Sequence, residues 1–258
     1  MMKIAILGAG NMGGATAKGL AASGYTAAEN ITVTAAHLEH LDPFKALGMK
    51  VTTDNAEAVK GADIIILAVK PWIAPVVMNE IRRTFNPFTQ LVVTMMPGVS
   101  DADMRQVLGD EAQIAYVIPN TAIAVGESMT FVSPTSASRE QTDMLVEMFS
   151  TMGHAMAVPY TQLSACTALA SCGIAFAMRY IRASVEGGVQ LGVKAHDGQD
   201  IVAQTVKGAA ALLCQEGAHA ESEIDKVTTP GGITIKGLNA MEKNGFTNAV
   251  IEGLLASK

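Results

Sequence analysis

The sequence predicts an α/β protein in which an N-terminal Rossmann-type domain with a doubly wound sheet precedes an all-helical C-terminal domain. A glycine-rich turn at residues 8–13 (GAGNMG) follows a short apolar run and opens a helical segment. Short apolar runs then alternate with helical patterns as far as residue 158, which is typical of a parallel sheet covered by helices. From residue 162 onward there is no convincing strand pattern. We therefore expect two domains, residues 1–159 and 160–258.

Short apolar or β-branched runs predict the strands of the first domain, at residues 3–7, 31–34, 51–52, 63–69, 91–94, 112–118, 129–132 and 155–158. The run at 63–69 (DIIILAV) predicts a strand buried on both faces. The predicted helices between the strands cover residues 15–22, 42–47, 56–60, 73–85, 101–108 and 139–152. Pro43 suits the first turn of its helix, and Ser100 is expected to cap the helix that follows it.

The second domain is predicted to consist of helices only, at residues 162–191, 195–216, 221–227, 233–244 and 246–256. Residues 148–178 contain no Asp, Glu, Lys or Arg, so a membrane helix must be weighed there. Pro159, Gln162 and several Ser and Thr residues favour a helix buried in protein instead. We expect residues 162–178 of this segment to lie between subunits of a homodimer.

Composition and charge indicate the kinds of partner and the compartment to expect for this protein. The net charge is −6 and no Lys/Arg run occurs, which argues against a nucleic-acid partner. Mean hydropathy is +0.29 with only 5% aromatic residues, a balance that suggests tightly packed helices and a buried subunit interface. Three cysteines without C-x-x-C spacing suggest free thiols in a reducing compartment. The glycine turn interrupts the one N-terminal apolar run, so this run is not expected to be a secretory signal. These features predict a cytoplasmic protein.

The glycine turn predicts a dinucleotide site, because it stands between a strand and a helix. Gly8 permits the tight turn, Gly10 lets the backbone approach a pyrophosphate, and Gly13 lets helix and strand pack closely. The free N–H groups and the dipole at the helix start favour phosphate. A glycine-rich turn without a ligand is the alternative.

The end of the second strand bears on the choice of dinucleotide. NAD-selective sites usually carry an Asp or Glu there, whereas this strand ends Thr34-Ala35-Ala36-His37. The missing carboxylate favours NADP(H), although no arginine is present after this strand to bind the 2′-phosphate. His37 could contribute, or it could be an ordinary exposed loop residue.

Three further strand ends are expected at the same edge of the sheet, where ligands of open α/β sheets lie. They carry AVKP at residues 68–71, MMPG at 95–98 and PNT at 119–121. Lys70 could thus face the cofactor, or it could be a solvated lysine before a helix. These strand ends predict the floor of a crevice.

A second anion site is predicted at residues 228–234 (TTPGGIT), where a Pro-Gly-Gly turn opens a helix. Its backbone N–H groups suit a carboxylate, and Thr234 could add a hydroxyl donor. A plain helix-linking turn is the alternative. No Ser-His-Asp, Cys-His or metal-binding constellation is recognisable; His154, His196 and His219 are scattered and are interpreted as surface or capping residues.

Four motifs together resemble one enzyme family. They are GAGNMG at residues 8–13, AVKP at 68–71, IPNT at 118–121 and, the most specific, VTTPGGITIKGLNAMEKNGF at 227–246. The chain resembles pyrroline-5-carboxylate reductases over nearly its whole length. The resemblance implies hydride transfer from NAD(P)H, with NADPH preferred and NADH possible, to the cyclic imine of pyrroline-5-carboxylate, the last step of proline biosynthesis. It also implies helical domains that interlock as dimers, sometimes assembled into a decamer.

The resemblance implies these site residues. The substrate residues are Thr229, Gly231, Gly232, Ile233, Thr234 and Asn120, with Thr234 also acting in catalysis because the turn holds the substrate carboxylate near the nicotinamide. The cofactor residues are Gly8, Gly10, Asn11, Met12, Gly13, Ala35, Asn55, Ala68, Val69, Lys70, Pro71, Met95, Met96 and Pro97. No metal is expected.

The chain departs from the family pattern at three positions near the expected substrate site: Ala122 stands where proline is usual, Ile174 likewise, and Ile233 replaces a threonine. Two alternatives therefore stay open. One is a β-hydroxyacid dehydrogenase relative, which normally carries a lysine on its long interdomain helix; residues 162–191 contain none. The other is a non-catalytic NADP-binding regulator.

Overall fold

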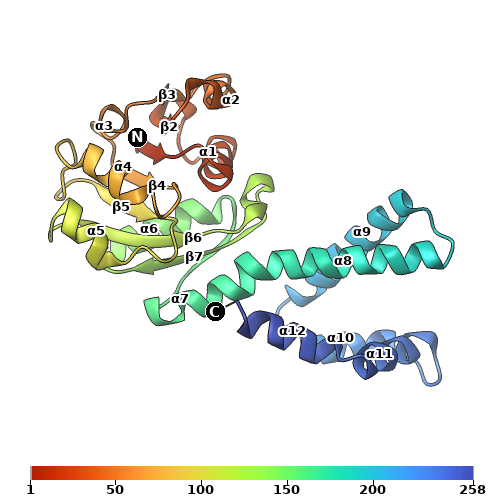
Figure 1. Cartoon of the computed structure of the whole chain (residues 1–258). Coiled ribbons are helices and arrows are strands. Elements are labelled where there is room, and N and C mark those ends of the chain that lie inside the picture. Colours follow the sequence, from red (N-terminus) through yellow and green to blue (C-terminus); the bar gives the residue numbers. More distant parts are fainter. Residues whose placement is uncertain (1, 258) are drawn as a thin grey trace. The chain divides into compact units, whose positions relative to one another are not determined.

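The computed structural model describes residues 2–257, and the chain divides into two compact units, residues 1–171 and 172–258 (Figure 1). The first unit is built on an eight-stranded sheet of order β3-β2-β1-β4-β5-β6-β7-β8. Its strands are β1 (Ile4–Leu7), β2 (Ile31–Thr34), β3 (Lys50–Thr52), β4 (Ile64–Leu67), β5 (Leu91–Thr94), β6 (Gln113–Ile118), β7 (Ser128–Pro134) and β8 (Gly153–Ala157). The order reverses direction between β1 and β4, which creates a crevice beyond their carboxyl ends.

The predicted parallel sheet is confirmed for β1 to β6, with a correction at β7. Ile4 of β1 lies opposite Ile31 of β2 and Ile64 of β4 in parallel register, but β7 pairs antiparallel with β6. Only residues 119–127, including the short helical turn η3 (Thr121–Val125), connect these two strands. A parallel return needs a crossover of roughly a dozen residues or more, so this connection is too short for one. β8 then runs parallel to β7.

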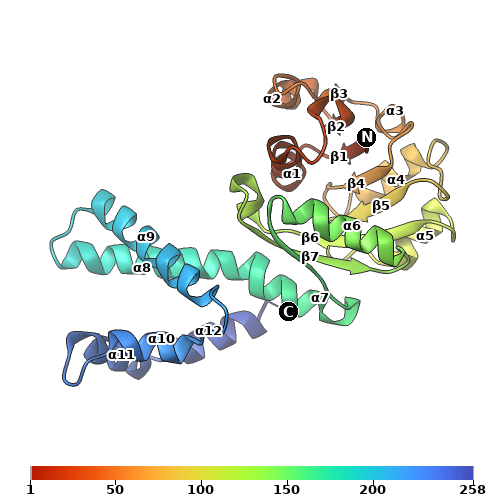
Figure 2. The ribbon, with the colours of Figure 1, turned by 180° about the vertical axis from the view of Figure 1, so that it is seen from behind.

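Helices cover both faces of this sheet (Figures 1 and 2). One face packs against α1 (Asn11–Ser23), α2 (Asp42–Lys45) and α6 (Arg139–Ser150). The other packs against α3 (Asn55–Ala58), α4 (Ala74–Ile81) and α5 (Asp101–Leu108). β4 is buried on both faces as predicted: Ile64 and Ile66 join the first cluster, and Ile65 and Leu67 the second.

Local sequence fixes the helix starts. Pro43 occupies the first turn of α2. The side chain of Ser100 accepts a hydrogen bond from the backbone N–H of Asp103, and the Asp103 carboxylate in turn accepts one from the backbone N–H of Ser100. Ser138 and Gln141 form the same capping box on α6. α2 and α5 therefore begin where Pro43 and Ser100 predicted, and α6 begins at the predicted residue 139.

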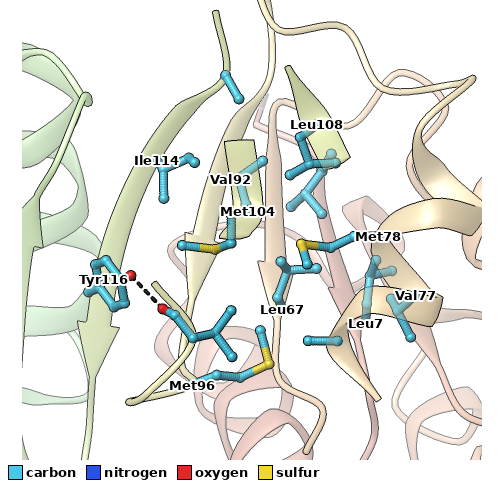
Figure 3. Close-up of a cluster of buried hydrophobic side chains, with 14 of the residues drawn as sticks. Leu7, Leu67, Val77, Met78, Val92, Met96, Met104, Leu108, Ile114 and Tyr116 are labelled. Carbon is cyan, nitrogen blue, oxygen red and sulfur yellow. Dashed lines mark hydrogen bonds between the residues drawn. The ribbon is translucent and has the colours of Figure 1, made fainter. Parts of the chain in front are cut away.

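The core between the sheet and α4 and α5 is almost wholly aliphatic and sulfur-containing (Figure 3). Tyr116 is its one aromatic ring with a hydroxyl, and this hydroxyl donates a 2.6 Å hydrogen bond to the backbone carbonyl of Val99. Burial, followed by the neighbouring Tyr160, raises the pKa of Tyr116 above its ordinary value. The phenol therefore stays protonated and ties β6 to the segment that precedes α5.

The second unit is helical, as predicted. A continuous helical run consists of α7 (Tyr160–Thr167), one π-helical turn η4 (Ala168–Cys172) and α8 (Gly173–Gln190). It is followed by α9 (Ala195–Leu213), α10 (Ala220–Val227), α11 (Ile233–Lys243) and α12 (Phe246–Leu255), and α9 packs against α8. Along the chain, the boundary between the two compact units falls within this run, after Ser171 and not at residue 159. α7 belongs to the first unit because its Leu163 is buried in the core of the sheet. The division of roles between residues 1–159 and 160–258 stays a prediction.

The second unit has almost no interior of its own. Among the described residues from 172 to 257, only Gly198 is buried. The helical run Tyr160–Gln190, with a mean hydropathy of 1.3 in its most apolar window, is long and apolar enough to cross a membrane by length and composition, and only 11% of that window is buried. An exposed apolar surface of this extent is typical of an interaction site.

The packing of α1 on the sheet generates a stability prediction. A Cβ atom on Gly13 would lie 2.0 Å from the carbonyl oxygen of Gly8 and 2.8 Å from Cβ of Ala68. We expect Gly13→Ala to lower the free energy of unfolding by about 3 kcal/mol, measured by urea denaturation. Gly10→Ala is the matched control: no atom lies within 4 Å of its added Cβ, and its cost should be about 1 kcal/mol or less. Equal losses would contradict this account of the packing.

Candidate cofactor and anion-binding sites

A cavity of about 700 Å³ lies beyond the carboxyl ends of β1, β2, β4 and β5, entirely within the first unit. All the predicted cofactor residues line it except Gly13 and Asn55. Residues from four separate segments, at 8–12, 35–36, 68–71 and 95–97, are thus brought to one place. This is the edge that the sequence predicted, at the point where the strand order reverses.

The glycine turn forms one wall of this cavity, and each glycine has a separate reason. Gly8 has φ +110°, and an added Cβ would lie 2.7 Å from the carbonyl oxygen of Ala68. Gly13 faces the protein interior, which explains why it does not line the cavity. Gly10 caps the start of α1 in an extended conformation and leaves the space beside its Cα empty. The backbone at residue 10 is therefore open to a bulky group.

The electrostatics of the cavity suit a polyanion. The described residues that line it include two with ionisable side chains, Lys70 and His40, and none with a carboxylate. The first turn of α1 contains no acidic residue either, so the partial positive charge of the helix start is not neutralised. In a chain of net charge −6, this is a local reversal of sign.

The floor of the cavity is apolar. Met95 and Met96 follow β5 directly and are almost completely buried. The hydroxyl of Thr16 on α1 lies 3.8 Å from the sulfur of Met95, and the backbone N–H of Met96 donates to the Thr94 hydroxyl at 3.2 Å. The first contact holds Met95 against α1, whereas Met96 packs into the core on the other face of the sheet, below α4 and α5. An apolar floor beside a phosphate-binding turn fits a molecule with a planar ring and a charged linker.

Asn55 is placed differently from the other predicted cofactor residues. It does not line the cavity. Its Oδ1 accepts a 2.6 Å hydrogen bond from the Thr34 hydroxyl, and its Nδ2 donates to Glu80 Oε2 at 2.7 Å. The side chain thus links the end of β2 to α4 and supports the cavity's rim. A direct contact of Asn55 with the cofactor stays a prediction.

Sequence reasoning passed over His40. It belongs to η2 (Leu38–His40), a turn of 3₁₀ helix after β2, and it lines the cavity, whereas His37 does not. The two rings pack edge to face with centroids 5.7 Å apart. Nothing in the spacing distinguishes His40 from its neighbour, because the short helical turn that places it beside the cavity has no sequence motif.

The Pro-Gly-Gly turn lies in the second unit. Gly231 has φ +72°, and the backbone N–H of Gly232 donates to the carbonyl of Thr229 at 2.9 Å, which closes a tight turn with proline at its second position. A Cβ on Gly232 would lie 2.5 Å from the Thr229 hydroxyl oxygen, so this turn excludes a side chain there. Gly232 then caps α11, whose first N–H groups are unsatisfied within the helix.

Thr234 lies in the first turn of α11 and is partly exposed, while Ile233 is 89% exposed. Within the described part of the chain, the Thr234 hydroxyl has no hydrogen-bond partner, so it is available to a ligand. The Asn120 side chain caps the turn that follows: its Oδ1 accepts from the backbone N–H of Ala122, while the backbone N–H of Asn120 donates to the Ser128 hydroxyl. Ala122, one of the departures from the family pattern, therefore still joins the capped turn after β6.

The described residues hold no group of three or more His, Cys, Asp or Glu side chains able to bind a metal. Each unit separately presents a helix start with free N–H groups, and the cavity of the first unit adds an apolar floor. Groups of this kind bind and orient molecules, which suits hydride transfer.

Comparison with known proteins matches both halves of the chain. The profile described as "Pyrroline-5-carboxylate reductase dimerisation" matches residues 161–258, and that described as "NADP oxidoreductase coenzyme F420-dependent" matches residues 3–98. Pyrroline-5-carboxylate reductase 1 of Dictyostelium discoideum is 38% identical over 98% of this chain, which spans only 48% of that protein. The pyrroline-5-carboxylate reductase of Methanosarcina acetivorans is 34% identical, with 99% of this chain and 97% of the relative covered.

Solved structures agree over the full length. The Coxiella burnetii pyrroline-5-carboxylate reductase has a TM-score of 0.91 at 28% identity, covering 99% of this chain and 96% of its own. The Plasmodium falciparum pyrroline carboxylate reductase, solved with NADP bound, has a TM-score of 0.89 at 26% identity, covering 99% and 95%. The sequence match, the fold and the glycine-lined cavity point the same way, and the chain belongs to the pyrroline-5-carboxylate reductase family.

Proposed function

We propose that this protein reduces 1-pyrroline-5-carboxylate to proline with hydride from NAD(P)H, NADPH being preferred. The observation that carries the proposal is the cavity at the sheet's switch point, which has a glycine turn on one wall and no carboxylate among its described lining residues. Gly8, Gly10, Asn11 and Met12 would hold the pyrophosphate, and Met95 to Pro97 would lie under the nicotinamide. The nicotinamide supplies the hydride.

The chain's own residues then have to bind and orient the imine. A cyclic imine accepts a proton readily, so its carbon is electrophilic without a strong acid from the protein. The N–H groups at the start of α11, with the Thr234 hydroxyl, form the proposed carboxylate site, assisted by Thr229, Gly231, Gly232 and Ile233. Asn120 is assigned to the substrate as well. Fixing the carboxylate fixes the ring, and orientation is most of what this reaction needs.

We further propose that the protein acts in the cytoplasm as a homodimer through residues 160–258, with a decamer as a possible larger assembly. Among the described residues of the second unit only Gly198 is buried, which supports a subunit interface as the cover for its apolar helices. Covering by a second subunit also accounts for the exposed apolar helix without a membrane.

One assay separates this function from its alternatives. Purified protein should oxidise NADPH, and NADH more slowly, when pyrroline-5-carboxylate is added. A non-catalytic NADP-binding regulator, which the departures at Ala122, Ile174 and Ile233 keep open, would bind NADPH without oxidising it. If the protein instead oxidises a β-hydroxyacid with NADP⁺ as the hydride acceptor, the dehydrogenase alternative is favoured.

Gly10→Val tests the cofactor site. The valine side chain fits the empty space of the free protein, so the fold should persist, but it occupies the volume proposed for the pyrophosphate. We expect NADP⁺ affinity to fall by about thirtyfold or more, which corresponds to about 2 kcal/mol, measured by isothermal titration calorimetry. Circular dichroism should match that of the native protein. Undiminished NADP⁺ affinity would show that the glycine turn does not bind the cofactor.

Thr234→Ala tests the substrate site. Loss of one hydrogen bond to a charged group costs roughly 1.5–3 kcal/mol, so kcat/KM for the imine should fall about ten- to a hundredfold while NADPH affinity barely changes. Thr234→Ser should restore most of the loss. Thr247→Ala, which removes a hydroxyl bonded to Glu242 on the same unit, is the matched control and should leave kcat/KM unchanged. Equal loss of NADPH binding and turnover in Thr234→Ala would make the turn purely structural.

Met178→Asp tests the interface. Met178 is 57% exposed on α8 and ends the charge-free segment, so a carboxylate there would be desolvated on association. We expect the dimer dissociation constant, measured by analytical ultracentrifugation, to rise about a hundredfold, or roughly 3 kcal/mol. Val125→Asp, at a site 75% exposed in the first unit, should leave association unchanged. A native protein that sediments as a monomer at micromolar concentration would refute the interface.

A further inference from the structure

The wall of the cavity after β2 has an unusual composition for a dinucleotide site. In this fold the adenosine ribose lies beyond the end of the second strand, where an acidic residue binds the 2′-hydroxyl of NAD or an arginine accommodates the 2′-phosphate of NADP. Here β2 ends at Thr34, and the following cavity-lining residues are Ala35, Ala36 and His40. Neither an acid nor an arginine lines this wall in the described structure, so His40 is its one polar side chain.

The fold aims His40 at this place. η2 is closed by a 3.2 Å hydrogen bond from the N–H of His40 to the carbonyl of His37, which sets the two rings on neighbouring positions of one turn. Their edge-to-face contact, with centroids 5.7 Å apart, restricts the orientation of the His40 ring. Lys70, the other ionisable side chain of the lining, comes from the loop after β4.

We propose that His40, held by the ring of His37, is the side chain that recognises the 2′-phosphate of NADP(H), and that preference for NADP(H) over NAD(H) therefore weakens as pH rises. The inference rests on the proposed use of this cavity for the cofactor. A neutral imidazole donates one hydrogen bond to a phosphate, and a protonated one adds a positive charge against its nearly two negative charges. Histidine is the side chain whose charge changes near neutral pH.

The other charged side chains near the end of β2 do not line the cavity, so His40 is the one placed to meet the phosphate. Glu39 lies on the same turn, and Asp42 and Lys45 lie on α2, which packs against it, but none of the three lines the cavity. Lys18 of α1 stands over the ring of Phe44, 5.7 Å from its centroid. Among the described residues His40 is in no ion pair, so an incoming phosphate meets an imidazole that no carboxylate has already engaged.

The test compares the binding of NADP⁺ and NAD⁺, which differ only in the 2′-phosphate, by calorimetry at pH 6 and pH 8 and without the imine. For the native protein we expect the ratio of the two affinities to favour NADP⁺ and to fall about tenfold between pH 6 and pH 8. In His40→Ala, NADP⁺ affinity at pH 6 should fall about tenfold, NAD⁺ affinity should hold, and most of the pH dependence of the ratio should vanish. The second ionisation of the phosphate, with a pKa of about 6, falls in the same range for every variant, so the difference between the native protein and His40→Ala isolates the contribution of His40.

Two variants keep the test sharp. His40→Asn retains a polar side chain that cannot be charged, so it should lose the pH dependence even if the alanine variant proves unstable. His154→Ala, which removes an exposed imidazole on β8, is the matched control and should behave as the native protein. An unchanged affinity ratio in both His40 variants, or equal losses for NADP⁺ and NAD⁺, would overturn the inference while leaving the proposed function intact. Failure of the native protein to bind either dinucleotide would overturn both.

Discussion

The close contact of α1 with β1 and β4 determines where the cofactor cavity can form. Gly13 brings the helix to the carbonyl of Gly8 and to Ala68 at distances that no side chain at residue 13 would allow. Because the helix is held so near the sheet, its amino end opens directly over the strand ends, with Gly10 facing free space. The place of the proposed anion site thus follows from packing in the core: residue 13 has the structural role in the glycine turn, and residue 10 has the proposed binding role.

The same division explains what the sequence alone could predict. Glycine, proline and capping residues act locally, so the turn at residues 8–13, the starts of α2 and α5, and the Pro-Gly-Gly turn were all recognisable. The sequence predicts β7 as a strand of a parallel sheet, but β7 pairs antiparallel with β6. The short connection after β6 is the feature of the sequence that indicates the antiparallel direction. His40 and the support role of Asn55 depend on side-chain directions set by tertiary contacts, which no local pattern encodes.

The two units contrast in how they reach stability. The sheet of the first unit buries aliphatic residues on both faces, and β4 contributes to both clusters. The second unit has more helix but, among its described residues, no buried apolar side chain. Since apolar burial is the main favourable term in folding, helices α8 to α12 need a second copy of the chain far more than the sheet does. The domain that is least stable alone therefore has the strongest reason to associate, and its family profile is that of a dimerisation domain.

The charge pattern connects this architecture to the chemistry. A protein of net charge −6 would repel a dinucleotide that carries several negative charges unless the binding surface reversed that sign locally. The described lining achieves the reversal with few cations: it omits carboxylates, exposes the N–H groups at the start of α1, and adds Lys70 and an imidazole. In the proposed site, the oriented amides at the start of α1 would bind the pyrophosphate, while the imidazole of His40 would meet only the 2′-phosphate. Cofactor binding would then depend mainly on the backbone, and the choice between the two dinucleotides would depend on one side chain.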